Sequence, residues 1–239
     1  MKIDISLLFE KPELDSSVIL IIQPLAPLSM VSDLPGSYYK TERIPTKFML
    51  SGLFENLLGW HFSKENRAKI FREMKKVHKK KFKQELEKEE SEVGYQSLVS
   101  YYFETAPPPL IPALQYYEDL WTQHLVGADT RHLDGSIHND WRLETHLLPM
   151  RAKEYESKRQ RDDIFTKYFK DNRSQFPLYY RSVPKREFVI AKGVYQFRLN
   201  INHQLLNLLQ NACSDMNIGY LGTSEGWVDV DFREGLING

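Results

Sequence analysis

Residues 185–232 read KREFVIAKGVYQFRLNINHQLLNLLQNACSDMNIGYLGTSEGWVDVDF. The apolar and aromatic run over 186–201, broken at Gly193, predicts two strands or one bent strand. Asn202 is a typical N-cap residue, and leucines at helical spacing follow it, so a helix is predicted to Met216. Valines alternate with aspartates over 227–232, which predicts a last strand. This part of the chain therefore has the order strand, strand, helix, strand.

The N-terminal half supplies the preceding elements. Residues 17–25 predict a buried strand, 45–60 a helix, 63–90 a second helix capped by Ser63, and 95–103 another strand. Without insertions the order is strand, helix, strand, strand, helix, strand, which is that of a ferredoxin-like (RRM-like) domain. We therefore predict an α+β protein with this fold.

Two further stretches fit this order poorly. The proline-rich residues 106–112 are not expected to continue a strand, and 111–126 are interpreted as a short helix. Residues 127–180 mix charges and aromatics without clean periodicity. A structureless loop of that length is uncommon in a compact domain, so we expect a projecting hairpin or helix there.

Composition excludes several classes of protein. The 239 residues include 32 basic and 32 acidic ones, and the single cysteine, Cys213, cannot form an internal disulfide. No apolar run approaches the roughly 20 residues of a membrane span, and the N-terminus lacks a signal-peptide pattern. We expect a cytoplasmic protein with no membrane partner.

The zero net charge conceals two basic stretches. Residues 64–83 hold ten basic and two acidic residues, and 140–186 hold twelve and seven, for net charges of +8 and +5. Such local charge attracts polyanions. The predicted basic surface consists of Lys75, Lys76, Lys79, Lys80 and Lys81. Alternatively the stretch is only a solvated helix face, which acids of the same helix (Glu85, Glu87, Glu89, Glu90) neutralise.

Enzymatic chemistry has weak support. His132, Asp134, His138 and Asp140 could bind a metal, but their spacing matches no standard ligand motif. A general acid–base ribonuclease needs a base, an acid and a cation near phosphate, and no spacing singles out such a set. The sequence has no G-x-S-x-G or Walker motif, and Cys213 falls on an apolar helix stripe. We predict no catalytic residue, metal or cofactor.

RNA binding has more support. Tyr38, Tyr39, Lys40, Arg43 and Lys47 bring stackable rings and cations to a loop that enters a helix. A helix N-terminus attracts phosphate, and aromatic rings can stack on unpaired bases. A glycine-rich turn at 219–226 includes Gly222 and Ser224 and permits close backbone approach to a ligand. An ordinary turn between helix and strand is the alternative.

Several motifs together resemble a known family. They are PLAPLSM at 24–30, TERIPTKFMLSGLFENLLGW at 41–60, KREFVIAKGVYQFRLNI at 185–201 and LGT at 221–223. The chain resembles the Cas-five family of CRISPR-associated RAMP proteins of type I Cascade complexes, most like those of type I-B. The resemblance implies a single RAMP-type domain over 1–239, with a basic helical insertion at 63–92 and a thumb-like insertion at 128–183.

The resemblance also implies a function. The family caps the 5′ handle of the guide RNA, which comprises its first nucleotides, and it contacts the backbone and large subunits, with target DNA nearby in the assembled complex. In most subtypes it is not catalytic. The implied RNA-binding residues are Tyr38, Tyr39, Lys40, Thr46, Lys47, Asn56, Gly222 and Ser224. The alternative is a metal-independent endoribonuclease that processes repeat RNA, as in one branch of the family.

Overall fold

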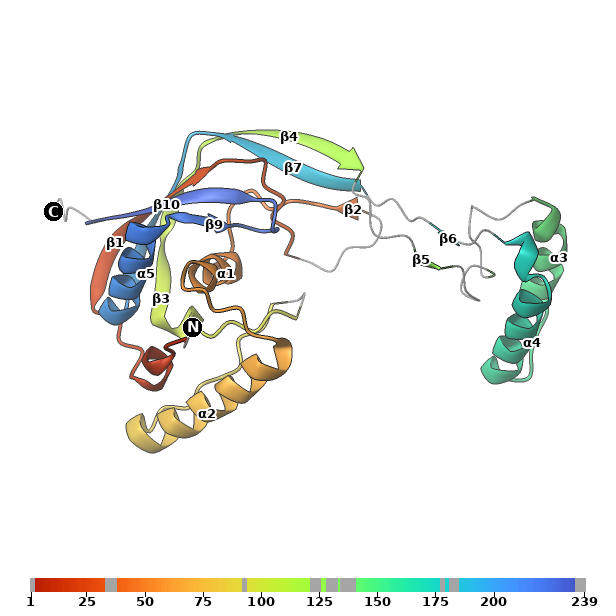
Figure 1. Cartoon of the computed structure of the whole chain (residues 1–239), viewed down its shortest axis with the longest axis horizontal. Helices are drawn as coiled ribbons and strands as arrows, with labels where there is room; N and C mark the ends of the chain where they lie inside the picture. The colour runs from red at the N-terminus through yellow and green to blue at the C-terminus, as the bar shows by residue number, and fades with distance from the viewer. Residues whose placement is uncertain are drawn as a thin grey trace. The chain divides into compact units, whose positions relative to one another are not determined.

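The computed structural model describes residues 3–32, 38–91, 94–120, 126–127, 133, 141–176, 179–180 and 185–234. The chain divides into two compact units. The first consists of Met1–Asp119 and Lys185–Gly239, and the second of Leu120–Pro184. Figure 1 shows the elements of each unit.

A five-stranded sheet forms the centre of the first unit (Figure 1). Its strands, in spatial order, are β3 (Phe103–Leu110), β8 (Tyr195–Ile201), β1 (Ser16–Pro24), β10 (Trp227–Glu234) and β9 (Ile218–Tyr220). Neighbouring strands are antiparallel, and Leu20 of β1 lies opposite Phe197 on one side and Phe232 on the other. If β1, β3, β8 and β10 are numbered one to four along the chain, their spatial order is two, three, one, four. This order confirms the ferredoxin-like prediction.

Two helices complete the ferredoxin-like core, α1 (Lys47–Leu57) after β1 and α5 (His203–Asp215) after β8. Their apolar residues and the alternate inward residues of the strands form one buried cluster. It includes Leu20, Leu50, Leu53, Phe54, Phe197, Leu205 and Leu209. As predicted, Asn202 caps α5, because its side-chain oxygen accepts hydrogen bonds from the backbone N–H groups of Gln204 and Leu205.

The basic helix is shorter than predicted. Helix α2 (Lys64–Phe82) begins after Ser63, whose hydroxyl accepts from the Asn66 N–H as expected. It ends where Lys83 takes a left-handed conformation, with φ of 55°. The acidic residues from Glu85 to Glu90 therefore follow the helix and are not part of it, so they do not pair with its lysines at helical spacing.

The region from 95 to 120 differs from the prediction. A short 3₁₀ helix, η2 (Ser100–Tyr102), precedes β3, and β3 continues through Pro107, Pro108 and Pro109. Those prolines are tolerated because β3 lies at the edge of its sheet. Residues predicted to be helical form β4 (Ala113–Leu120) in a second sheet of order β2–β7–β4. The other strands of that sheet are β2 (Tyr38–Tyr39) and β7 (Lys185–Lys192). The Tyr117 ring stacks on Phe188 of β7, 5.3 Å apart, so pairing with a distant strand overrides the local pattern.

The second unit has its own small core. Helices α3 (Trp141–Ala152) and α4 (Lys158–Asp171) bury Leu143, Leu147, Phe165 and Phe169 against Phe176. A short strand pair joins β5 (Val126–Gly127) to β6 (Tyr179–Tyr180). Short 3₁₀ helices occur in both units, η1 (Ser6–Phe9) in the first and η4 (Arg173–Gln175) in the second. None of the helices within the described ranges is long and apolar enough to cross a membrane.

Candidate functional site

The N-terminal end of α1 is fixed by local hydrogen bonding. Thr46 precedes the helix in an extended conformation, and its hydroxyl accepts from the Met49 N–H at 3.3 Å. Leu50, Leu53 and Phe54 bury one side of the helix in the core. Met49, Gly52 and Asn56 consequently lie on a side that faces a cavity.

The glycine-rich turn after β9 approaches the chain closely at one residue. Gly222 has φ of +80°, and a Cβ atom there would lie 2.4 Å from the Ser29 carbonyl oxygen. Only glycine fits both the conformation and this contact. The turn is thereby held against the segment that leads from β1 toward α1.

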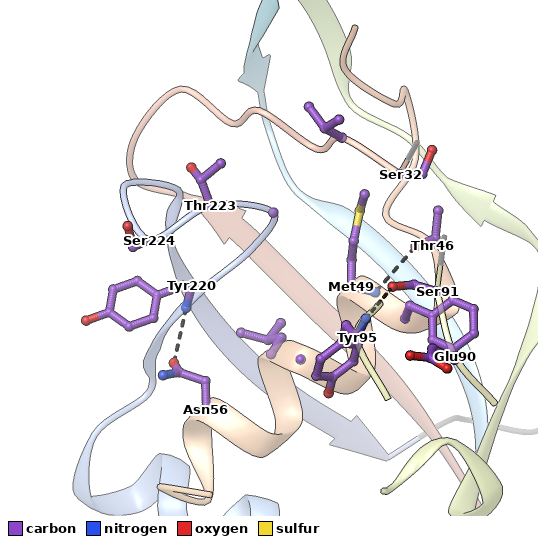
Figure 2. Close-up of a pocket in the computed structure, with 15 residues that line it drawn as sticks. Ser32, Thr46, Met49, Asn56, Glu90, Ser91, Tyr95, Tyr220, Thr223 and Ser224 are labelled. Atoms are coloured by element: carbon purple, nitrogen blue, oxygen red, sulfur yellow. Dashed lines mark hydrogen bonds between the residues drawn. The ribbon is translucent and has the colours of Figure 1, made fainter. Parts of the chain in front are cut away.

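Asn56 of α1 holds the end of β9, where the glycine-rich turn begins, against the helix. Its side-chain oxygen accepts from the Tyr220 N–H at 3.3 Å, as the dashed line in Figure 2 shows. Next to it, a Cβ atom on Gly219 would come within 2.6 Å of the Leu53 side chain, so β9 and α1 are closely packed. β9 and α1 therefore form one surface.

A cavity of about 570 Å³ opens between these segments (Figure 2). Its lining comes from residues 31–32, from α1 and its cap, from Glu90, Ser91 and Tyr95, and from the turn at 220–224. The polar lining residues are Ser32, Thr46, Asn56, Glu90, Ser91, Tyr95, Tyr220, Thr223 and Ser224. The rest are apolar or glycine, namely Val31, Phe48, Met49, Gly52, Leu53 and Gly222. We call this cavity the α1 pocket.

The pKa values of two ionisable groups in the α1 pocket are shifted, in opposite directions. Burial, aided by the nearby Glu55 carboxylate, raises the pKa of Tyr95, so its phenol stays neutral. A hydrogen bond from Lys88 lowers the pKa of Glu90, so this carboxylate stays charged. The pocket therefore combines apolar walls with hydroxyl and amide groups and one carboxylate.

A buried ion pair supports the Tyr95 wall from behind. Glu55 on α1 is 2% exposed, and its carboxylate accepts from the Arg67 guanidinium of α2 and from the Leu98 N–H at 2.9 Å. Arg67 also donates to the Gln96 carbonyl at 3.2 Å and lies over the Tyr95 ring, 4.9 Å from its centroid. Burial raises the pKa of Glu55, and Arg67 opposes this rise. The pair thus joins α1, α2 and the 95–98 segment.

The family assignment follows from the sequence as a whole. The family model described as CRISPR-associated protein Cas5p matches residues 3–232. The chain belongs to this Cas5p family. This agrees with the family resemblance drawn from its motifs, and the family description identifies the chain as a CRISPR-associated protein.

Other comparisons add little to the Cas5p assignment. No curated protein matches the sequence significantly. A chain from a cryo-EM structure of a type III-B Cmr-beta complex, bound to cognate target RNA and AMPPnP, is 14% identical with a TM-score of 0.32. The match covers 91% of this chain and 63% of that one. The fold assignment rests instead on the strand order described above.

Four of the predicted RNA-binding residues meet in the Cas5p chain. Thr46, Asn56, Gly222 and Ser224 all line the α1 pocket, although they come from opposite ends of the sequence. Lys47 lies beside it, with its ammonium group 3.6 Å from the Glu89 carboxylate. The first helix and the last turn are therefore adjacent, which the sequence alone left open.

The other predicted RNA-binding residues do not line this pocket. Tyr38 and Tyr39 form β2 in the second sheet, where the Tyr38 hydroxyl donates to Glu187 at 3.2 Å. The Arg186 guanidinium lies 4.8 Å from the centre of the Tyr39 ring. Lys40 and Arg43 follow β2 on the way to α1.

The remaining predicted sites have separate locations. Lys75, Lys76, Lys79, Lys80 and Lys81 all belong to α2. The metal candidates His132, Asp134, His138 and Asp140 lie outside the described residues. Within the described ranges, no group of three or more potential ligands could hold a metal ion.

Four of the fifteen residues that line the pocket are among the predicted ones. Ser32, Ser91 and Tyr95 belong to none of the motifs, and only the tertiary structure brings them together. Gly52 is the lining residue that the sequence could have indicated. A glycine inside a helix costs about 1 kcal/mol relative to alanine, so its presence needs another reason. A Cβ atom at Gly52 would meet no atom within 4 Å, so close packing within the chain does not explain it. The glycine leaves pocket space open instead.

Proposed function

We propose that this Cas5p-family chain is the non-catalytic subunit of a type I Cascade complex that holds the 5′ handle of the guide RNA, with an unpaired nucleotide in the α1 pocket. The observation that carries the proposal is the meeting of the first helix and the last glycine turn around one cavity. Both segments carry the motifs on which the family resemblance rests. Family membership supplies the CRISPR context.

The chemistry of the pocket suits a nucleobase better than a phosphate. Apolar walls from Val31, Phe48 and Met49 offer contact to a flat ring, and hydroxyl and amide groups can bond to its edges. The charged Glu90 disfavours a phosphate inside the pocket. Lys47 at its edge offers a cation to the backbone of a strand whose base lies inside.

The proton chemistry of the pocket supports a binding role. A general acid or base works best with a pKa near the operating pH. Tyr95 and Glu90 are shifted in the opposite sense, the phenol upward and the carboxylate downward. We therefore propose that the subunit is not an enzyme. Incubation of repeat RNA with the purified protein in EDTA tests this, and specific cleavage would establish the endoribonuclease alternative.

The proposal includes the setting of the subunit. A Cascade subunit contacts backbone subunits and a large subunit, and works in the cytoplasm. A reducing compartment is compatible with Cys213, whose thiol has its pKa raised to about 11 by burial. Co-purification with neighbouring CRISPR proteins, with sequencing of the bound RNA, tests the partners. A random RNA population would contradict a handle-binding role.

The decisive experiment substitutes Gly52 by alanine. The change improves helix propensity by about 1 kcal/mol, so the protein is expected to fold at least as well as the wild type. The new methyl group projects into open space in the pocket lining. Crowding of a fitted site by one methyl group costs about 1–3 kcal/mol, which is roughly a 5- to 150-fold loss of handle affinity.

Asn211→Ala provides the matched control. Asn211 is exposed on α5, so its replacement also improves helix propensity without touching the pocket. Affinity for the co-purifying guide RNA is measured by fluorescence anisotropy for both variants and the wild type. If Gly52→Ala folds and binds this RNA as tightly as Asn211→Ala, the α1 pocket does not hold the nucleotide.

A further inference from the structure

The outer side of α2 carries a line of cations that the proposed RNA site does not use. With 100° between successive helical residues, Lys69, Arg72, Lys76, Lys79 and Lys80 fall within an arc of about 100°. We call these five residues the outer stripe. All five are exposed, and the stripe is about 17 Å long at 1.5 Å per residue. Such a stripe is a continuous cationic ridge rather than scattered charge.

The opposite side of α2 is firmly anchored. Phe71, Met74 and His78 are buried, and His78 Nε2 lies 3.0 Å from the Leu8 carbonyl oxygen. The buried Arg67–Glu55 pair adds a second attachment nearer the start of the helix. Figure 1 shows α2 at the periphery of the first unit. The fold therefore fixes the direction in which the outer stripe points.

The outer stripe keeps most of its charge. Lys76 pairs with Glu73, but Lys69, Arg72, Lys79 and Lys80 form no ion pair with the described part of the chain. The acidic segment after the helix pairs with α2 through Glu85, whose partner Lys75 lies to one side of the stripe, 3.4 Å away. Exposed pairs of this kind are weak, so the stripe stays strongly positive.

The stripe also lacks the features of a single-strand site. Proteins that bind single strands combine cations with aromatic rings on which bases stack. The aromatic residues of α2 are Phe71, His78 and Phe82, and none belongs to the outer stripe; His78 lies against the Phe82 ring on the anchored side. Cations alone on a straight, rigid element match the closely spaced phosphates of a duplex.

We propose that the outer stripe of α2 binds the phosphate backbone of a nucleic acid duplex, independently of base sequence and separately from the α1 pocket. Its five cations lie along one line, so they can follow one phosphate ridge beside a groove. Because no group on the stripe is suited to reading bases, the contact positions a duplex and leaves sequence recognition to other surfaces.

The test uses the full chain and a variant with all five stripe residues changed to glutamine. Binding of a fluorescent 20-base-pair DNA duplex, a duplex RNA of the same length and a single strand is measured between 50 and 200 mM KCl. If all five cations contact phosphates, the contribution of the stripe to wild-type duplex affinity should fall about 500-fold between the lowest and the highest salt concentration. The variant is expected to bind duplexes at least tenfold more weakly at low salt, with a shallower salt dependence.

A charge-matched control separates the stripe from overall charge. Replacement of Lys11, Lys185, Lys192, Arg198 and Arg233 by glutamine removes the same charge from other exposed positions of the first unit. This control is expected to retain nearly all of the duplex affinity. Equal losses in the two variants would overturn the proposal, as would a wild-type preference for the single strand.

Two further outcomes are decisive. Guide RNA binding by the stripe variant should equal that of the wild type, because the α1 pocket is untouched. Parallel loss of guide RNA and duplex would mean that the stripe belongs to the handle site, which overturns the proposal. A stripe variant that binds duplexes normally but no longer co-purifies with neighbouring proteins would show a protein-docking surface instead. If Gly52→Ala loses guide RNA binding and the stripe variant keeps it, the loss concerns the α1 pocket and leaves the proposal for the stripe unaffected.

Discussion

Replacement of Arg67 by methionine tests how the pocket wall is held in place. Methionine keeps much of the length of the side chain and removes the guanidinium. Glu55 then retains the hydrogen bond from the Leu98 N–H and loses its ion-pair partner. The carboxylate is 2% exposed, so water cannot replace the lost partner.

The expected cost follows from this burial. Removal of one member of a buried ion pair costs about 3–5 kcal/mol, because the other charge is left uncompensated. Because Glu55 keeps the hydrogen bond from the Leu98 N–H, we expect the cost of its lost partner to lie near the lower end of this range. The hydrogen bond that Arg67 no longer donates to the Gln96 carbonyl adds about 1 kcal/mol. We therefore expect the free energy of unfolding to fall by about 3–4 kcal/mol at neutral pH.

The loss should depend on pH. Burial already raises the pKa of Glu55 above its ordinary value of 4.5, and Arg67 limits this rise. Without Arg67 the folded-state pKa rises further, so the folded variant takes up a proton more readily than the unfolded chain. Its stability should therefore recover as pH falls through the raised folded-state pKa, with the recovery complete below about 4.5.

Urea unfolding followed by far-UV circular dichroism, from pH 8 to 4, measures both effects. The control is Lys76→Met, which breaks an exposed pair with Glu73, 2.7 Å long, and should cost less than about 0.5 kcal/mol. The double variant Arg67→Met with Glu55→Gln should regain much of the loss, because no buried charge remains. A single variant within 0.5 kcal/mol of the wild type, or a loss that grows as pH falls, would refute the reasoning.

Two further substitutions probe the glycine-rich turn at the site and the cap of α5. Gly222→Ala should cost at least about 2 kcal/mol of stability in urea unfolding, because it combines a left-handed conformation with a Cβ 2.4 Å from the Ser29 oxygen. Gly59→Ala, with φ of +69° and open space around it, isolates the conformational part, and equal losses would argue against the clash. Asn202→Ala should cost about 2 kcal/mol in the same assay, since Asn202 caps α5 and also donates to the Glu13 carbonyl at 3.0 Å. A loss below 0.5 kcal/mol would show that these bonds are replaced by water.

Elements with strong local signals were predictable from sequence. The leucine spacing after Asn202 gave α5, and the alternation around Val228 and Val230 gave β10. These signals are local because one face of each element is buried against the rest of the core. Chain order then led to the ferredoxin-like arrangement, which the strand order confirms.

Elements that depend on distant partners were not predictable in the same way. Prolines normally end a strand, but β3 keeps Pro107 to Pro109 because it lies at the sheet edge. Residues 113–120 form a strand because β7 lies beside them. For the α1 pocket, sequence motifs identify Thr46 and Gly222. Tyr95 lies in a stretch predicted to be a strand. Its place in the pocket wall depends on Arg67 of α2, which lies over its ring.

The attachment of the second unit bears on how chains of this kind can diverge. Residues 120–184 leave the first unit after β4 and return at β7, and these two strands are neighbours in one sheet. The segment also has a separate core of its own around Leu147 and Phe165. Insertions, deletions or wholesale exchange of this segment therefore leave the register of the first unit unchanged. Selection can remodel it as an independent module while the α1 pocket stays constant.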